Sequence, residues 1–224
     1  SEEEKNKALD QMTALLDTFI DAKEYGSILT VEQYDWELLE SFVEGSDDAG
    51  QIRMDNLHLD DTAQELRQMI AQGKVLGEKY HVAVTNPPYM GIIGMNRNLS
   101  DYIKNNYLEG KIDLFASFII RCQIFVKQYG YHAMITQHSW MSLGSCENLR
   151  IQLLLKSSII NMAHLGARAF DEIPGEVVQT TAFVLLKKIS SDYVGKYMRL
   201  LDYAGEKKKE EAYIIADNST VYFA

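Results

Sequence analysis

The spacing of apolar residues changes near residue 80. Before that point apolar residues recur every three or four positions, the period of a helix that buries one face. In the second such stretch Thr30 stands three positions before Gln33, the spacing of a helix capping box. Gly73 follows the third stretch and is expected to loosen the chain. The pattern predicts three amphipathic helices, over residues 5–24, 30–45 and 60–72.

Beyond residue 80 the apolar residues come in short, nearly continuous runs, which are typical of buried strands. Longer apolar segments between them fit helices, the first ended by Gly130 and the second capped by Ser145. This alternation favours a mostly parallel sheet with crossover helices. The charged run over 205–212 is expected to be a solvated loop. Strands are predicted over 81–85, 131–138, 159–166 and 176–188, and helices over 113–130 and 145–158.

Composition is that of a soluble globular protein, with 46% apolar and 24% charged residues among 224. No apolar run approaches the roughly 20 residues that a membrane span requires, and the first residues lack the features of a signal peptide. We therefore expect a cytoplasmic protein with no membrane partner. Cys122 and Cys146 have no zinc-site spacing, so we expect no metal, and buried thiols are favoured over a disulfide.

Charge is distributed unevenly along the chain. Residues 1–80 carry 7 Lys and Arg against 19 Asp and Glu, whereas residues 81–224 carry 15 against 13. An acidic first part is a poor surface for a polyanion, so contacts with nucleic acid are expected from the second part or from outside this sequence. Because the sequence begins with serine and stops on an apolar run, we expect it to be a piece of a longer protein.

The stretch VAVTNPPYMGIIG, residues 82–94, places an asparagine and two prolines directly after a predicted strand. Asn86 precedes a proline, which favours an extended backbone, and Pro87 and Pro88 have no N–H and fix the direction of the chain. The side-chain oxygen of Asn86 and the carbonyl of Pro87 are then two neighbouring acceptors, which suit an amino group. Tyr89 adds a flat face for stacking. The order predicts a site for the amino group of a planar base; a plain turn at a strand end is the alternative.

This arrangement suits methylation of the N6 amino group of adenine. Hydrogen bonds from N6–H to Asn86 and to the Pro87 carbonyl would localise the nitrogen lone pair for attack on a methyl sulfonium. The base must first leave the duplex at a cost of a few kcal/mol, which stacking on Tyr89 would partly offset.

Asn86, Pro87, Pro88 and Tyr89 resemble the catalytic tetrapeptide of amino methyltransferases that use S-adenosylmethionine. The chain is most similar to the large adenine-specific DNA methyltransferases of phage-defence and restriction systems, the PglX-like group. The resemblance implies DNA as substrate, S-adenosylmethionine as cofactor, and other restriction or defence proteins as partners. It is carried by residues 21–29, 86–91, 111–141, 177–188 and 200–212.

The resemblance also implies the fold class and the domains. The fold class is α/β, comprising the later strands of a partial Rossmann-like, S-adenosylmethionine-dependent methyltransferase sheet with a helical N-terminal segment. Residues 1–80 would be an acidic helical segment, and residues 81–224 the catalytic half of the methyltransferase domain. The glycine-rich cofactor loop and the target-recognition region of the family are missing. The resulting free sheet edge is expected to be covered by the acidic helices or by a second copy in a homo-oligomer.

Other residues receive roles only through the resemblance. Phe170 falls where related enzymes place an aromatic residue against the flipped base, although a core or loop phenylalanine is an equal alternative. His138 and Trp140 could line the same site, but a bonded polar neighbour and a core indole are favoured. Asp113 and Phe115 are weak candidates for cofactor contact, with helix capping and packing as the favoured alternatives.

Two other functions fit the same residues. Methylation of a protein glutamine or of ribosomal RNA would keep the amino-group chemistry, because those methyltransferases share the Asn-Pro-Pro-aromatic order. A non-catalytic interaction module of a defence complex would explain the missing cofactor loop.

Overall fold

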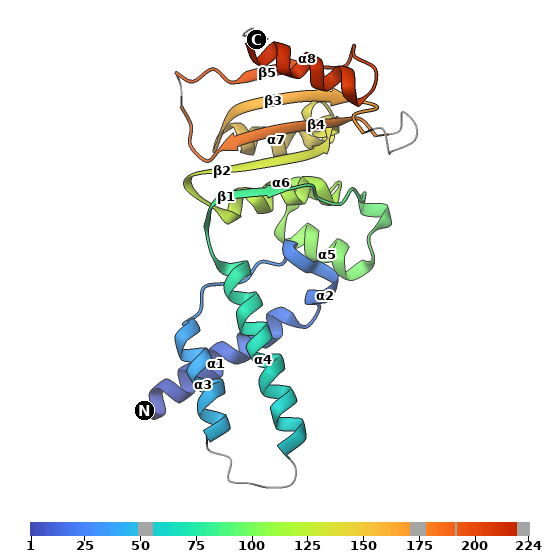
Figure 1. Cartoon of the computed structure of the whole chain (residues 1–224). Coiled ribbons are helices and arrows are strands. Elements are labelled where there is room, and N and C mark those ends of the chain that lie inside the picture. Colours follow the sequence, from blue (N-terminus) through green and yellow to red (C-terminus); the bar gives the residue numbers. More distant parts are fainter. Residues whose placement is uncertain (49–55, 171–177, 191, 219–224) are drawn as a thin grey trace. The chain divides into compact units, whose positions relative to one another are not determined.

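The computed structural model describes residues 1–48, 56–170, 178–190 and 192–218. The chain divides into two compact units, Ser1–Glu78 and Lys79–Ala224, which are described separately below (Figure 1). The assignment of the second part as a catalytic half stays a prediction.

The first unit is helical. Its first helix begins at the start of the sequence because Ser1 and Glu4 form a reciprocal capping box, and it buries Ala8, Met12 and Leu15. The predicted capping box at Thr30 is wrong, since residues 29–35 are not helical and the Gln33 amide donates to the Gly77 carbonyl instead. The helices are α1 Glu2–Phe19, α2 Ala22–Tyr25, α3 Trp36–Asp48 and α4 Asn56–Gly77, with a 3-10 turn η1 at Gly26–Ile28.

Gly73 does not loosen α4, contrary to the sequence prediction. It lies inside the helix, and a Cβ atom at this position would stand 3.1 Å from Leu15 Cδ1 and 3.2 Å from the Trp36 ring. The glycine therefore allows α1 and the start of α3 to pack closely against α4, at the cost of some helix propensity.

The second unit is built on a five-stranded sheet (Figure 1). Its order is β1-β2-β4-β3-β5; β1 pairs with β2 and β3 with β5 in parallel, whereas β4 is antiparallel to both of its neighbours. The predicted α/β class is confirmed, but a mostly parallel sheet is wrong, because β4 returns between β2 and β3 without a crossover helix among the described residues. The strands are β1 Tyr80–Thr85, β2 Val126–Gln137, β3 Ser158–Gly166, β4 Thr180–Leu186 and β5 Lys196–Arg199.

The helices of this unit differ from the prediction at their ends. The helix predicted over 113–130 ends at Phe125, and Gly130 lies within β2, where a Cβ would stand 2.9 Å from the His81 carbonyl oxygen. The next helix is capped by Cys146 rather than Ser145. The helices are α5 Arg97–Asn106, α6 Leu114–Phe125, α7 Glu147–Leu154 and α8 Glu206–Asn218, with 3-10 turns η2 Ile92–Gly94, η3 Leu108–Gly110, η4 His138–Met141 and η5 Gly144–Cys146.

The charged run over 205–212 is helical, not a loop. Most of it belongs to α8, and Lys209 is 4% exposed because its ammonium donates to the carbonyls of Leu165 at 2.6 Å and Leu200 at 2.8 Å. Bonds of this kind satisfy the buried cation and fix α8 to the ends of β3 and β5. Burial lowers the pKa of Lys209.

The core lies where α6 and α7 pack on one face of the sheet. Phe115 and Ile119 from α6 meet Met134, Phe183 and other buried apolar side chains of the strands. Both cysteines are free and buried, as predicted, and burial raises the pKa of the Cys122 thiol to about 11.

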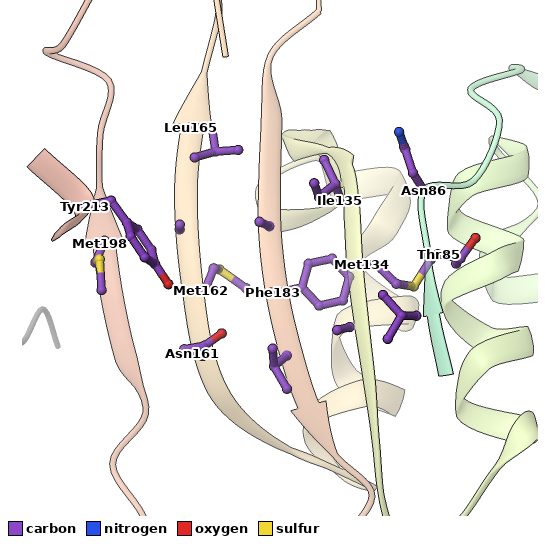
Figure 2. Close-up of a pocket in the computed structure, with 15 residues that line it drawn as sticks. Thr85, Asn86, Met134, Ile135, Asn161, Met162, Leu165, Phe183, Met198 and Tyr213 are labelled. Carbon is purple, nitrogen blue, oxygen red and sulfur yellow. The ribbon is translucent and has the colours of Figure 1, made fainter. Parts of the chain in front are cut away.

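The opposite face of the sheet is open in part. Val82 and Val84 of β1 are 56% and 74% exposed, so the prediction of a buried strand is wrong for β1. Figure 2 shows side chains of this region, from Asn86 at one end to Tyr213 of α8 at the other, around a cavity of about 470 Å³. Among the described residues no helix is long and apolar enough to cross a membrane.

Candidate functional site

The candidate site begins where β1 ends. Thr85, the last residue of β1, is aligned with Met134 of β2, so Asn86 stands at the carboxyl end of two parallel strands. The Asn86 side chain is exposed and points beyond the end of the strand (Figure 2). Pro87 is buried and Pro88 exposed. The two prolines thus lead the chain out of the sheet with the carboxamide at its rim.

Tyr89 is held beside the carboxamide. Its hydroxyl lies 3.4 Å from Asn86 Oδ1 and 3.3 Å from the Ile135 carbonyl oxygen, and its ring meets Phe115 edge to face at 6.0 Å between centroids. Burial, and secondarily the charge of Asp113, raise the pKa of Tyr89. The hydroxyl therefore stays neutral near pH 7, and its single proton is shared between Asn86 Oδ1 and the Ile135 carbonyl oxygen.

Asp113 ties the loop to α6. Its Oδ1 accepts hydrogen bonds from the Met90 N–H at 3.0 Å and the Phe115 N–H at 3.1 Å, and the Leu114 N–H donates to the Met90 carbonyl at 2.9 Å. Burial raises the pKa of Asp113, and the backbone N–H groups oppose that shift. Asp113 is the N-cap of α6, and Phe115 is 1% exposed. Capping and packing, the favoured alternatives, are what the structure shows; contact of either residue with a cofactor stays a prediction.

Asn86 Oδ1, which is exposed, and the carbonyl of the buried Pro87 are two acceptors that follow each other at the end of β1. Within the described part of the chain nothing donates to the Pro87 carbonyl, and the Tyr89 hydroxyl is the donor to Asn86 Oδ1. A carboxamide oxygen has two lone pairs, so it can accept a second hydrogen bond from a ligand. This geometry can receive an amino group with two N–H donors.

The other predicted residues occupy different places. Trp140 is a core indole: it is 4% exposed and its Nε1–H donates to Thr136 Oγ1 at 3.1 Å. The Nδ1 atom of His138 lies 3.2 Å from the Gln179 carbonyl oxygen. Phe170 is half-buried four residues after β3 and directly precedes residues outside the description, so its stacking role stays a prediction.

A second histidine, His164, lies next to His138, and nothing in the sequence pattern points to it. The rings of His138 and His164 lie 5.1 Å apart, and the His164 pKa is lowered by burial first and by His138 second. His164 precedes the end of β3 by two residues, and only the strand order places it beside the end of β2. A neutral His164 imidazole adds a polar group to the same sheet end without adding charge.

The described residues do not fit S-adenosylmethionine by themselves. A methyltransferase of this fold would hold it by a glycine-rich turn after a strand and an acidic residue for the ribose. Among the strand ends that the structure describes, β1 is followed by Asn86, β2 by His138, β3 by Ala167, β4 by Lys187 and β5 by Leu200. Of these, only β5 leads directly to an α-helix, and its connection, residues 200–205, contains a single glycine and is not a glycine-rich turn. The same residues hold no cluster of three potential metal ligands.

Comparison with known proteins places this chain among methylases. Residues 7–170 match the family model described as Eco57I restriction-modification methylase. The chain is 43% identical over 207 residues to adenine-specific methyltransferase PglX of Lacticaseibacillus casei (strain Zhang), covering 92% of this chain and 17% of that protein. It is 40% identical over 197 residues to adenine-specific methyltransferase BrxX of Escherichia coli O9:H4 (strain HS). This match covers 85% of this chain and 16% of that protein.

A solved structure supports the fold alone. The cryoEM structure of a DrdV–DNA complex matches with a TM-score of 0.50 at 18% identity, over 67% of this chain and 17% of that one. The predicted resemblance to the PglX-like group is confirmed by the relatives. The chain spans about a sixth of the length of the curated relatives it matches.

Proposed function

The chain belongs to the Eco57I restriction-modification methylase family, and from this premise we propose that it forms the amino-group site of an adenine-specific DNA methyltransferase. The reaction transfers a methyl group from S-adenosylmethionine to N6 of adenine in DNA. One observation carries the proposal: the Asn86 carboxamide is exposed at the end of β1, directly before Pro87, and the Tyr89 hydroxyl lies 3.4 Å from its Oδ1.

The residues of this chain would act on the adenine. Asn86 Oδ1 and the Pro87 carbonyl each accept one N6–H bond, which draws the lone pair out of the ring and makes the nitrogen a better nucleophile. The cofactor, when bound, supplies an electrophilic methyl group. Neither acceptor is a titratable base, so the amino group would release its proton to water, and only after it has gained the methyl group.

Tyr89 has two parts in this proposal. Its ring offers a face to the flipped base, and base–aromatic stacking contributes roughly 1–3 kcal/mol. Its hydroxyl donates to Asn86 Oδ1, which keeps a second lone pair for the ligand. The edge-to-face contact with Phe115 keeps the ring in place before the base arrives.

The wider assignments follow from the same proposal. DNA is the substrate, other proteins of a restriction or phage-defence system are the partners, and the cytoplasm is the compartment. Contacts with DNA come from the second unit, because residues 1–80 are strongly acidic. By itself the chain would pair along the free edge of β1 as a homo-oligomer; elution as a monomer at high concentration in size-exclusion chromatography would exclude this.

The decisive experiment is Asn86→Ala in the enzyme that contains this chain. We expect N6-methyladenine to fall to background in sequenced genomic DNA, with folding unchanged because the prolines set the turn. Asn98→Ala, an exposed asparagine in α5, is the matched control and should methylate normally. Methylation by Asn86→Ala near the wild-type level would refute the assignment.

One observation favours a second function, the non-catalytic interaction module. The described residues lack a cofactor turn, so the chain alone would act through its surface. This alternative predicts that Asn86→Ala retains full protection against phage in cells. Loss of both protection and methylation would exclude it.

A further inference from the structure

The 3-10 turn η2, directly after the candidate catalytic loop, presents a fully exposed isoleucine. Ile93 is 99% exposed, the most exposed of the large apolar side chains in the described residues. Single apolar residues on a surface are ordinary, so exposure alone implies nothing. The backbone around Ile93 is what sets it apart.

Hydrogen bonds fix this turn on both sides. The Ile92 N–H donates to the Ile112 carbonyl at 3.1 Å, and the Gly94 N–H donates to the Gly91 carbonyl at 2.8 Å. Gly91 also forms a β-bridge with Asp113, the residue that holds the Met90 N–H. A Cβ on Gly94 would stand 3.3 Å from Met90 Cγ, so the Met90 side chain packs against the turn.

The turn η2 and the candidate catalytic loop are therefore both bonded to Asp113. Asp113 holds the segment through Met90, and Tyr89 packs on Phe115 two residues further along. An exposed side chain on such a rigid support keeps one direction relative to Asn86. A merely tolerated surface isoleucine needs no such support.

We propose that Ile93 is a wedge that enters the DNA base stack where the target adenine leaves it. The inference rests on the proposed function. Isoleucine is among the side chains that proteins insert between base steps to unstack them. Tyr89 and Ile93 are four residues apart, so their Cα atoms are separated by at most about 14 Å. That reach equals about four base-pair steps of 3.4 Å, so one side chain can stack on the flipped base while the other fills the gap.

The surroundings suit a DNA backbone. Residues 90–100 contain no acidic residue, in a chain whose net charge is −10. Arg97 starts α5 four residues after Ile93; its side chain is 93% exposed and pairs with Asp101 at 3.6 Å. An exposed guanidinium at a helix N-terminus can contact the phosphate next to the wedge.

The test uses the enzyme that contains this chain and its own recognition site, mapped by sequencing N6-methyladenine. Two duplexes are compared: the paired site, and the same site with an abasic position opposite the target adenine. Ile93→Ala should lower kcat/KM about 10-fold on the paired site and less than 2-fold on the abasic one. In the abasic duplex the target adenine has no pairing partner, so it leaves the stack without the help of a wedge. Ile93→Leu should stay near wild type on both.

Leu108→Ala is the matched control, because Leu108 is also an exposed apolar side chain, at 56%, and belongs to a different 3-10 turn, η3. It should not change kcat/KM on either duplex. Wild-type kinetics of Ile93→Ala on the paired site, or an equal loss on both duplexes, would overturn the wedge while Asn86→Ala still abolished methylation. Failure of the wild-type enzyme to methylate either duplex would instead refute the proposed function.

Discussion

Replacing Asp113 tests whether one carboxylate supports the whole candidate site. Asp113→Ala removes the oxygen that accepts two hydrogen bonds, from the N–H groups of Phe115 and Met90. Loss of a helix N-cap costs about 1 kcal/mol. The second N–H is left without its partner, which adds roughly 1–2 kcal/mol. The free energy of unfolding should fall by about 2–3 kcal/mol, or about 5–10 °C in Tm for a unit of this size.

Asp113→Asn separates shape from charge, because the amide keeps an acceptor oxygen in the same place. Burial raises the pKa of Asp113, so the folded state holds its proton more tightly than the unfolded chain does. The wild type therefore loses stability relative to Asp113→Asn as the pH rises from the ordinary carboxyl pKa of about 3.9 through the raised one. The difference in Tm, variant minus wild type, should become more positive over that range.

Thermal unfolding followed by circular dichroism at several pH values measures both variants, and Glu109→Ala, a half-buried acid four residues earlier in the chain, is the control. Methylation by Asp113→Ala should fall, because the loop that carries Asn86 and Tyr89 loses its hydrogen bond to Asp113 through the Met90 N–H. Asp113→Asn should keep most of the activity. An Asp113→Ala variant that melts within about 1 °C of the wild type would show that solvent replaces both bonds.

Three further predictions concern other parts of the second unit. Tyr89→Ala should weaken catalysis by roughly 1–3 kcal/mol and Tyr89→Phe by less, since the latter loses only the hydroxyl contact; equal effects in kinetics would contradict stacking. Burial first, and Lys187 second, lower the pKa of His132 to about 4, so stability should fall as the pH drops from about 6.5 through 4, by up to about 1.4 kcal/mol per unit. His132→Gln should flatten that slope in acid unfolding curves. Isothermal titration of residues 1–224 with S-adenosylmethionine should be flat, and a micromolar constant would show that a cofactor turn was overlooked.

The backbone of the candidate loop, residues 86–89, could be predicted because its geometry is local. Two prolines determine the backbone at Asn86 whatever surrounds it, and the acceptors follow from covalent structure. The order of the strands could not be predicted in the same way. β4 lies between β2 and β3, and this arrangement depends on pairings such as Met134 with Phe183, about 50 residues apart.

The predicted ends of helices and strands were wrong for a related reason. Gly130 was expected to end a helix, yet it is needed where β2 passes close to the His81 carbonyl. The run around Lys209 was expected to be solvated, yet that lysine binds carbonyls of Leu165 and Leu200. In both cases a distant backbone segment decides the conformation, and local propensity gives only a weak preference.

Ile93 shows how far hydrophobic pattern can mislead about function. A pattern treats each apolar residue as a candidate for burial, because burying apolar surface is what stabilises most folds. Ile93, which is 99% exposed, breaks that rule. The hydrogen bond that holds the adjoining backbone, from the Ile92 N–H to the Ile112 carbonyl, joins residues 20 positions apart. Because local sequence does not reveal such a bond, the exception becomes visible only in the folded chain. Deviations of this kind concentrate at sites of function, where a fold gives up apolar burial for contact with a partner.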